Sequence, residues 1–117
     1  MAGARMRRVN EAVREVVSAH IAEDVADPRI GFVTVTGVET SADLRSARVF
    51  VSILGEQQER DAALAGLASA SGYLQQRVGE ELRLKRTPTL DFVHDDSIRH
   101  GMRITELLAE EGRGPAR

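Results

Sequence analysis

The chain has no cysteine, no tryptophan and only one lysine, and it contains no long apolar run. Without cysteine it cannot form disulfides, thiolate metal sites or a cysteine nucleophile, and this composition is compatible with a reducing compartment. No stretch approaches the roughly 20 apolar residues that span a bilayer, and the first residues lack the apolar segment of a secretory signal. We therefore expect a soluble, cytoplasmic protein without membrane association. Its 117 residues, 42% of them hydrophobic, suit one domain with a single core.

The scarcity of lysine leaves arginine as nearly the only cation. Of the 16 basic residues all but Lys85 are arginines, whose planar guanidinium suits bidentate phosphate contacts and stacking on bases. A coding bias would explain the same richness. The formal net charge of −2 argues against a protein that coats nucleic acid through bulk positive charge. Basic residues nevertheless gather in 1–8 and 83–86, and acids in 23–27 and 106–111, which allows a basic face on an acidic molecule.

Hydrophobic periodicity predicts a helix followed by a hairpin in the first half of the chain. Apolar residues three to four apart indicate a helix over 9–21, which ends before the turn signal Asp27-Pro28. Valine-rich runs over 32–38 and 47–53 indicate two strands. Because the connector 40–43 is short and polar, we expect these strands to form an antiparallel hairpin.

A serine and a glycine interrupt the helical pattern of the second half. In the stretch 61–84 the motif Ala70-Ser71-Gly72 combines a hydroxyl that can bond to its own backbone with a residue that costs about 1 kcal/mol relative to alanine in a helix. The motif therefore predicts two helices that meet at an angle. A third strand is expected over 89–95, and Asp96-Ser97 can cap a last helix over 98–108.

The order helix, strand, strand, broken helix, strand, helix predicts an α+β fold with a three-stranded sheet covered by helices on one face. This order fits a KH-like domain of type II over residues 5–110, followed by a short flexible tail at 111–117. KH modules clamp four nucleotides with a GxxG loop between two helices. Here Ala70-Ser71-Gly72 stands in the place of that loop, so shape and nearby arginines would have to supply the specificity.

The sequence resembles the ribosome-binding factor A family over about residues 5–108. The residues that carry the resemblance are, in chain order, Arg5, Arg8-Val9, Asp27-Pro28-Arg29-Ile30, Val33-Thr34-Val35-Thr36, Val38, Ser41, Asp43-Leu44, Ala47, Ala70-Ser71-Gly72, Pro88, Leu90, Phe92 and Asp95-Asp96-Ser97. The resemblance implies a monomer that binds 16S ribosomal RNA on the 30S subunit during late maturation, including 5′-end processing. It also implies a link to growth at low temperature and release by a ribosome-assembly GTPase. Gln75 and Asp91 depart from residues common in the family, and the C-terminal extension is short.

We predict an RNA-binding site built from clustered cations and from the helix interruption, without a metal or cofactor. The predicted site residues are Arg5, Arg7, Arg8, Ser71, Gly72, Tyr73, Arg77, Arg83, Lys85, Arg86, Arg99 and Arg103, together with Ala70 of the interruption. A solvated helix face is the alternative for each single arginine. Tyr73 is the one aromatic expected near the site, because the phenylalanines lie on predicted strands, where core packing is expected.

Two other functions compete with RNA binding. A metal-dependent enzyme could be imagined from His94, Asp95, Asp96 and His100, but their spacing matches no known ligand motif and helix capping explains Asp96. We therefore expect no enzyme. A KH-like adaptor that docks a protein through the acidic residues 106–111, without touching RNA, remains the alternative. Binding by several arginines should weaken steeply with salt, whereas apolar docking should not.

Overall fold

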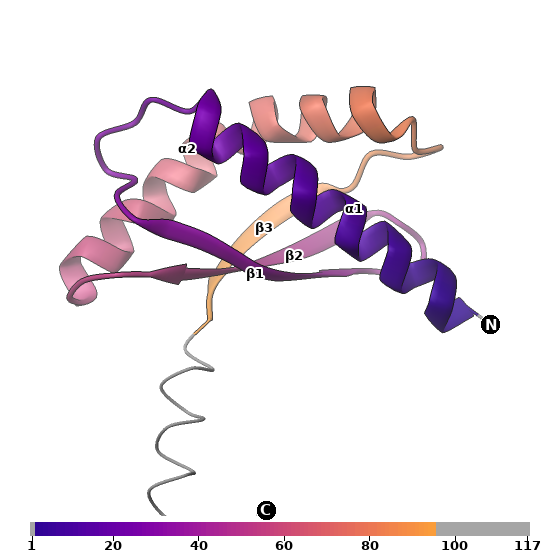
Figure 1. Cartoon of the computed structure of the whole chain (residues 1–117), viewed down its shortest axis with the longest axis horizontal. Coiled ribbons are helices and arrows are strands. Elements are labelled where there is room, and N and C mark those ends of the chain that lie inside the picture. Colours follow the sequence, from indigo (N-terminus) through magenta and orange to yellow (C-terminus); the bar gives the residue numbers. More distant parts are fainter. Residues whose placement is uncertain (1, 96–117) are drawn as a thin grey trace, which may run out of the picture.

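The computed structural model describes residues 2–95 of the chain (Figure 1). It contains five elements: α1 (Ala2–Glu23), β1 (Val33–Thr40), β2 (Ser46–Ile53), α2 (Gln57–Leu82) and β3 (Thr89–His94). Their types and order are those predicted from the sequence, and α1 begins several residues earlier than its apolar stripe indicated. The predicted last helix, the tail, Arg99 and Arg103 lie outside the described residues. No helix within residues 2–95 is long and apolar enough to cross a membrane.

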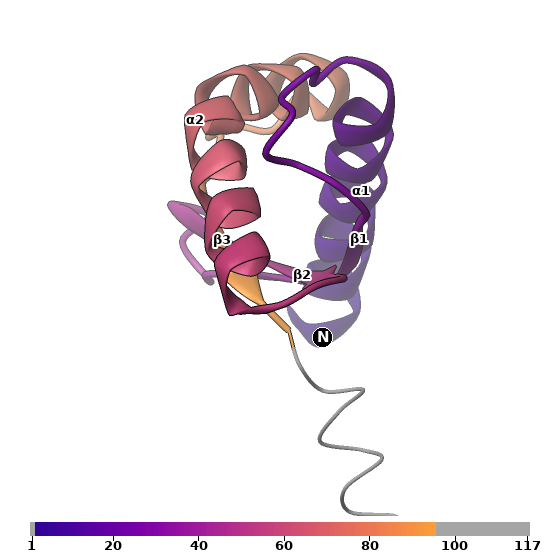
Figure 2. The ribbon, with the colours of Figure 1, turned by 90° about the vertical axis from the view of Figure 1, so that its left-hand side faces the viewer.

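The three strands form one sheet with β2 in the centre. β1 pairs with β2 in antiparallel register, as the hairpin prediction required, and β2 pairs with β3 in parallel register. Parallel neighbours need a crossover connection, which α2 supplies. Both helices cover the same face of the sheet. α1 lies on the side of β1, and α2 lies on the side of β3 (Figure 2).

The hairpin turn between β1 and β2 is held by two side chains of the connector. The Ser41 hydroxyl donates to Asp43 at 2.7 Å and accepts the backbone N–H of Ser46 at 3.1 Å, and Asp43 accepts the backbone N–H of Arg45 at 3.0 Å. Leu44 adopts a positive φ of 61° to close the turn. These bonds explain why short polar residues occupy the connector.

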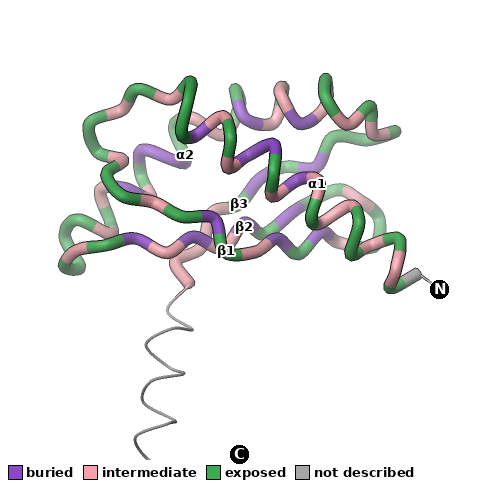
Figure 3. Tube along the Cα trace, viewed as in Figure 1, coloured by how far each residue is buried: buried purple, intermediate pink, exposed green. Residues whose placement is uncertain are grey.

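The hydrophobic core lies between the sheet and the two helices (Figure 3). Alternate residues of β2 point into it, so that Val49 and Val51 are fully buried, as their period-2 spacing predicted. The largest fully buried side chains are Leu67, Leu74, Val13, Val17, Val49, Val51, Val78 and Pro88. Because α1 and α2 contribute valine and leucine at helical spacing, one core joins all five elements.

The interruption in α2 is a bend within one helix rather than a boundary between two helices. The helix runs without a gap from Gln57 to Leu82, and its ribbon changes direction near the middle (Figure 1). The hydroxyl of Ser71 donates to the carbonyl of Ala68 at 2.8 Å, and that of Ser69 donates to the carbonyl of Ala65 at 3.1 Å. Serine bonds of this kind bend a helix without ending it. The predicted change of direction is therefore confirmed, but the two arms form one continuous helix and not two separate helices (Figure 1).

Candidate nucleic-acid interface

Predicted cations from the two helices lie at one end of the molecule. Arg5, Arg7 and Arg8 occupy the first turns of α1, and Arg83, Lys85 and Arg86 follow the last turn of α2; Figure 1 shows both segments on its right-hand side. All six side chains are exposed. Within residues 2–95 none of the six takes part in an ion pair. Their charges are therefore available to an anionic partner.

The hairpin places a further arginine, Arg45, between these two groups. The backbone N–H of Thr40 donates to Asn10 of α1 at 2.9 Å, and the N–H of Thr89 in β3 donates to the carbonyl of Arg45 at 2.9 Å. Arg45 itself is exposed, and its only ion pair among the described residues is a loose one with exposed Asp43 at 3.5 Å. Arg45 was not among the predicted site residues. The predicted hairpin could have indicated it, because the turn of the hairpin lies beside the start of β3.

We call this surface the basic end, formed by Arg5, Arg7, Arg8, Arg45, Arg83, Lys85 and Arg86. Backbone contacts hold the loop after α2, which carries Lys85 and Arg86. Arg83 adopts the left-handed conformation, with φ 50° and ψ 41°, and its N–H donates to the carbonyl of Gly79 at 3.1 Å. A Cβ at Gly79 would lie 2.6 Å from the Thr87 hydroxyl, so the loop approaches the helix closely there. Pro88 is fully buried beneath the loop.

The exposed side of α2 beside Gly72 carries a shallow polar hollow. Its volume is about 470 Å³, and its lining residues are Gly72, Gln75, Gln76, Gly79, Glu80 and Thr87. A Cβ at Gly72 would meet no heavy atom within 4 Å, so the helix surface is open there. The hollow thus connects Gly72 with the loop that carries Arg86. Gln75 also has a structural role, because its side-chain oxygen accepts the backbone N–H of Leu90 at 3.0 Å and joins α2 to β3.

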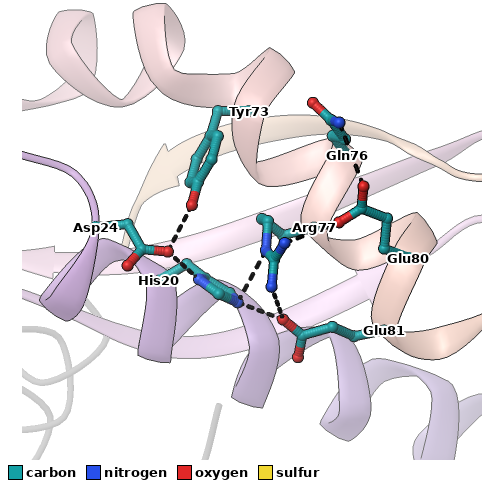
Figure 4. Close-up of polar contacts among 7 residues, drawn as sticks. All are labelled: His20, Asp24, Tyr73, Gln76, Arg77, Glu80 and Glu81. Atoms are coloured by element: carbon teal, nitrogen blue, oxygen red, sulfur yellow. Dashed lines mark hydrogen bonds and ion pairs between the residues drawn. The ribbon is translucent and has the colours of Figure 1, made fainter.

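Tyr73 and Arg77 belong to a different cluster, which joins α2 to α1 (Figure 4). The Tyr73 hydroxyl donates to Asp24 at 2.6 Å, and Arg77 forms ion pairs with Glu80 at 2.8 Å and Glu81 at 3.0 Å. Two carboxylates therefore neutralise Arg77, in contrast to the cations of the basic end. Tyr73 is 43% exposed, but its polar atom is already bound.

His20 lies at the centre of this inter-helix cluster. One ring nitrogen contacts the Asp24 carboxylate, and the other contacts Glu81 at 2.5 Å. These two hydrogen bonds, Asp24 first, raise the pKa of His20 above its ordinary value. The Tyr73 hydroxyl and then His20 lower the pKa of Asp24. When it is protonated, the imidazole donates to Asp24 directly after α1 and to Glu81 of α2, and so joins the two helices.

The phenylalanines differ in their surroundings. Phe92 packs against the core, as expected. Phe50 is half-buried and lies on the opposite face of β2 from buried Val49 and Val51. Phe32, immediately before β1, is 82% exposed, so the expectation that it lies in the core is wrong. Counting in twos from buried Val35 places Phe32 on the outer side of the sheet, whereas counting from buried Val38 gives the opposite result, because a bulge lies between Val35 and Gly37.

Residues 2–95 contain no group of three His, Asp or Glu side chains that could hold a metal ion. Of the four residues considered for such a site, Asp96 and His100 lie outside the described residues. Asp95 accepts the Thr36 hydroxyl at 2.6 Å and joins β3 to the bulge of β1.

Comparison with known proteins connects this geometry to one family. The family model described as ribosome-binding factor A matches residues 5–108. Ribosome-binding factor A of Halothermothrix orenii is 47% identical over 104 residues, which cover 89% of this chain and 85% of that protein. The crystal structure of ribosome-binding factor A from Thermus thermophilus matches with a TM-score of 0.69 at 25% identity, over 76% of this chain and 94% of that chain.

A homology model of the Thermus thermophilus protein, fitted into the cryo-EM map of a complex with the 30S subunit, is also similar. It matches with a TM-score of 0.62 at 25% identity, over 74% of this chain and 91% of that chain. These structural matches confirm the KH-like α+β fold predicted from the sequence.

Proposed function

The chain belongs to the ribosome-binding factor A family, and we propose that it binds 16S ribosomal RNA on the 30S subunit during late maturation. In this proposal it assists 5′-end processing, acts in the cytoplasm as a monomer without catalysing a reaction, and is released by an assembly GTPase. The domain over 5–110 carries the function. The observation that carries the proposal is the basic end, whose six predicted cations are exposed and form no ion pair among the described residues.

Phosphate contacts by the basic end would supply affinity, and the folded shape would supply the choice of site. The basic end holds seven cations on three segments: the start of α1, the hairpin turn and the loop after α2. Six to ten phosphate contacts lose on the order of 10³ to 10⁵ in affinity between 50 and 200 mM salt. The opening beside Gly72 would allow a nucleotide to approach the helix backbone, as the glycines of a KH loop do. That the related Thermus protein was fitted into a 30S complex supports this partner.

Co-sedimentation with purified 30S subunits, 50S subunits and 70S ribosomes over a salt series tests the proposal. The informative variant is Lys85→Ala/Arg86→Ala, because both side chains are exposed and neither backbone has a positive φ. Arg14→Ala/Arg60→Ala removes the same charge away from the basic end and is the matched control. We expect selective, salt-sensitive binding to 30S subunits that weakens in the first variant and persists in the control.

The opposite result would favour a different function. If both variants bind as the unchanged protein does, and salt has little effect, the chain docks through protein contacts as an adaptor. Equal binding to all three particles, or none, would overturn the 30S assignment.

A further inference from the structure

The outer edge of β1 carries backbone groups that do not face β2. The N–H of Leu54 donates to the carbonyl of Phe32 at 3.3 Å, which identifies this pair as a hydrogen-bonded one. Bonded and non-bonded pairs alternate in an antiparallel ladder, so Val33 and Val35 turn their N–H and C=O groups away from β2. Within residues 2–95 no other strand lies on this outer side of Val33 or Val35. The first half of β1 is therefore an unpaired strand edge.

An apolar groove runs beside this edge. Its volume is about 540 Å³, and it lies between the second half of α1, the turn after α1 and the first half of β1. Its apolar lining comes from Ile21, Val25, Ile30, Phe32, Val33 and Val35. Phe32, which lines the groove, is 82% exposed, and Leu54, its cross-strand neighbour, is 76% exposed, so two large apolar side chains stand in solvent beside the start of β1. Such an exposed patch is typical of an interaction site.

The unpaired charges next to the groove are negative. Glu15 lies one helical turn before lining residue Ser18 and also lines a second hollow with Glu81, and Glu23 directly follows lining residue Ala22. Neither Glu15 nor Glu23 forms an ion pair among the described residues. The nearby arginines are neutralised, since Arg14 pairs with Glu11 and Arg29 with Asp27. Residues 11–39 hold six carboxylates against two arginines, and once these arginines are paired four carboxylates remain, of which Asp24 contacts His20 and Tyr73. These surroundings would repel RNA and attract a basic peptide.

We propose that this groove binds an extended, lysine- and arginine-bearing protein segment, which adds to β1 as a further strand. The outward groups of Val33 and Val35 would supply main-chain hydrogen bonds, the groove would take alternate apolar side chains, and Glu15 and Glu23 would select the basic ones. The groove is lined by the first residues of β1. These residues lie at the end of the strand away from the hairpin turn (Figure 1), so the groove is separate from the basic end. The assignment of this segment to a protein of the 30S subunit rests on the proposed function. The inference that the segment is extended and basic does not.

The first experiment measures peptide binding by the full chain in solution. The probe is a seven-residue peptide of alternating lysine and valine, and its control carries glutamate in place of lysine. We expect the basic peptide to protect the amides of Val33 and Val35 from hydrogen exchange, and the acidic peptide to bind at least tenfold more weakly. Equal binding of the two peptides, or protection elsewhere, would overturn the proposal.

Two kinds of variant distinguish the addition of a strand to β1 from non-specific apolar binding. Val33→Pro removes an outward N–H at the first residue of an edge strand, where proline is tolerated, and Val33→Ile is its matched control. Phe32→Ala and Leu54→Ala remove exposed side chains and should leave the fold intact. Binding should fall at least tenfold in Val33→Pro, persist in Val33→Ile and weaken in the two alanine variants. Unchanged binding in Val33→Pro, with folding verified by circular dichroism, would show that no strand is added.

Hydrogen exchange of the chain without peptide tests whether another segment of this chain, or a second copy, fills the groove. Protection of Val33 and Val35 in a dilute solution, independent of concentration, would mean that another segment of this chain fills the groove. Protection that rises with concentration would mean a second copy. Either result would refute the proposal.

Photo-crosslinking from position 32 to purified 30S subunits then identifies the natural partner. An adduct with a lysine- and arginine-rich stretch of a ribosomal protein supports the assignment, and an adduct with ribosomal RNA contradicts it. If the chain fails to bind 30S subunits at all, the proposed function fails while the peptide experiment still decides what the groove binds.

Discussion

Replacing Gly72 with alanine should stabilise the fold and weaken binding to the 30S subunit. Gly72 is exposed inside α2, its φ is not positive, and a Cβ there would meet no heavy atom within 4 Å. Alanine gains about 1 kcal/mol over glycine in a helix interior. With an unfolding entropy of roughly 2.1 cal/mol/K per residue, this gain corresponds to a rise in Tm of about 4 °C for a chain of this length.

Gly66→Ala is the matched control, because it makes the same change in the same helix. Gly66 is buried, and its Cβ would lie 2.8 Å from Ile30 Cγ1 and 3.3 Å from Asp27 Oδ2. The turn after α1 therefore packs directly on this glycine. Overpacking costs about 1–3 kcal/mol, so it should cancel or exceed the gain in helix propensity. We expect urea unfolding, followed by circular dichroism, to place Gly72→Ala above the unchanged protein and Gly66→Ala at or below it.

Binding of Gly72→Ala to 30S subunits distinguishes a contact between the hollow and RNA from the effect of the substitution on helix stability. If a nucleotide approaches the backbone beside Gly72, the added methyl group should weaken 30S binding several-fold while the fold becomes more stable. A Gly72→Ala variant that is less stable than the unchanged protein, or no more stable than Gly66→Ala, would refute the packing argument. A stabilised variant with full 30S affinity would show that the hollow does not contact RNA.

Three further predictions concern the fold. Leu74→Ala removes a fully buried side chain and should lower the free energy of unfolding by about 2–5 kcal/mol in urea titrations. Asn10→Ala removes the acceptor of the Thr40 N–H and should lower it by about 1–3 kcal/mol in the same assay. Because the folded-state pKa of His20 is raised, its stabilising contribution is complete below the unfolded-state pKa and is lost as pH rises through the folded-state value. Stability should therefore fall as pH rises from mildly acidic to above neutral, and this fall should shrink in His20→Gln; an unchanged pH profile would contradict the assignment.

Local patterns predicted the elements because each has a clear period. The alternation in β2 indicated that Val49 and Val51 are buried, and the spacing of valines in α1 indicated its apolar face. The helix interruption was overestimated because Ser71 bonds back to the carbonyl of Ala68, a contact that keeps the helix continuous. The sequence contains no signal that decides between these outcomes, since serine and glycine are compatible with either a bend or a break.

Contacts between distant parts of the chain could not be predicted in the same way. Arg77 looked like any other arginine, and only the packing of α1 against α2 shows that Glu80, Glu81 and His20 surround it. Tyr73 meets Asp24, which lies 49 residues away in the sequence. Such pairs depend on the crossing of two helices, which hydrophobic periodicity does not determine. The resemblance to a family located the segments but not these partners.

If the proposed function holds, the segregation of charge along β1 would give the molecule a preferred orientation toward RNA. The strand begins near the end of α1, where Glu23 forms no ion pair among the described residues, and ends at the hairpin that carries Arg45. A uniformly basic protein would bind any phosphate backbone, whereas here one end attracts phosphates and the other repels them. Non-specific binding would therefore be limited to poses in which the basic end meets the RNA. If so, removing negative charge at the acidic end, as in Glu15→Gln/Glu23→Gln, should increase binding to unrelated RNA more than binding to the 30S subunit. Equal increases for both would show that the position of the acidic groups contributes nothing to selectivity.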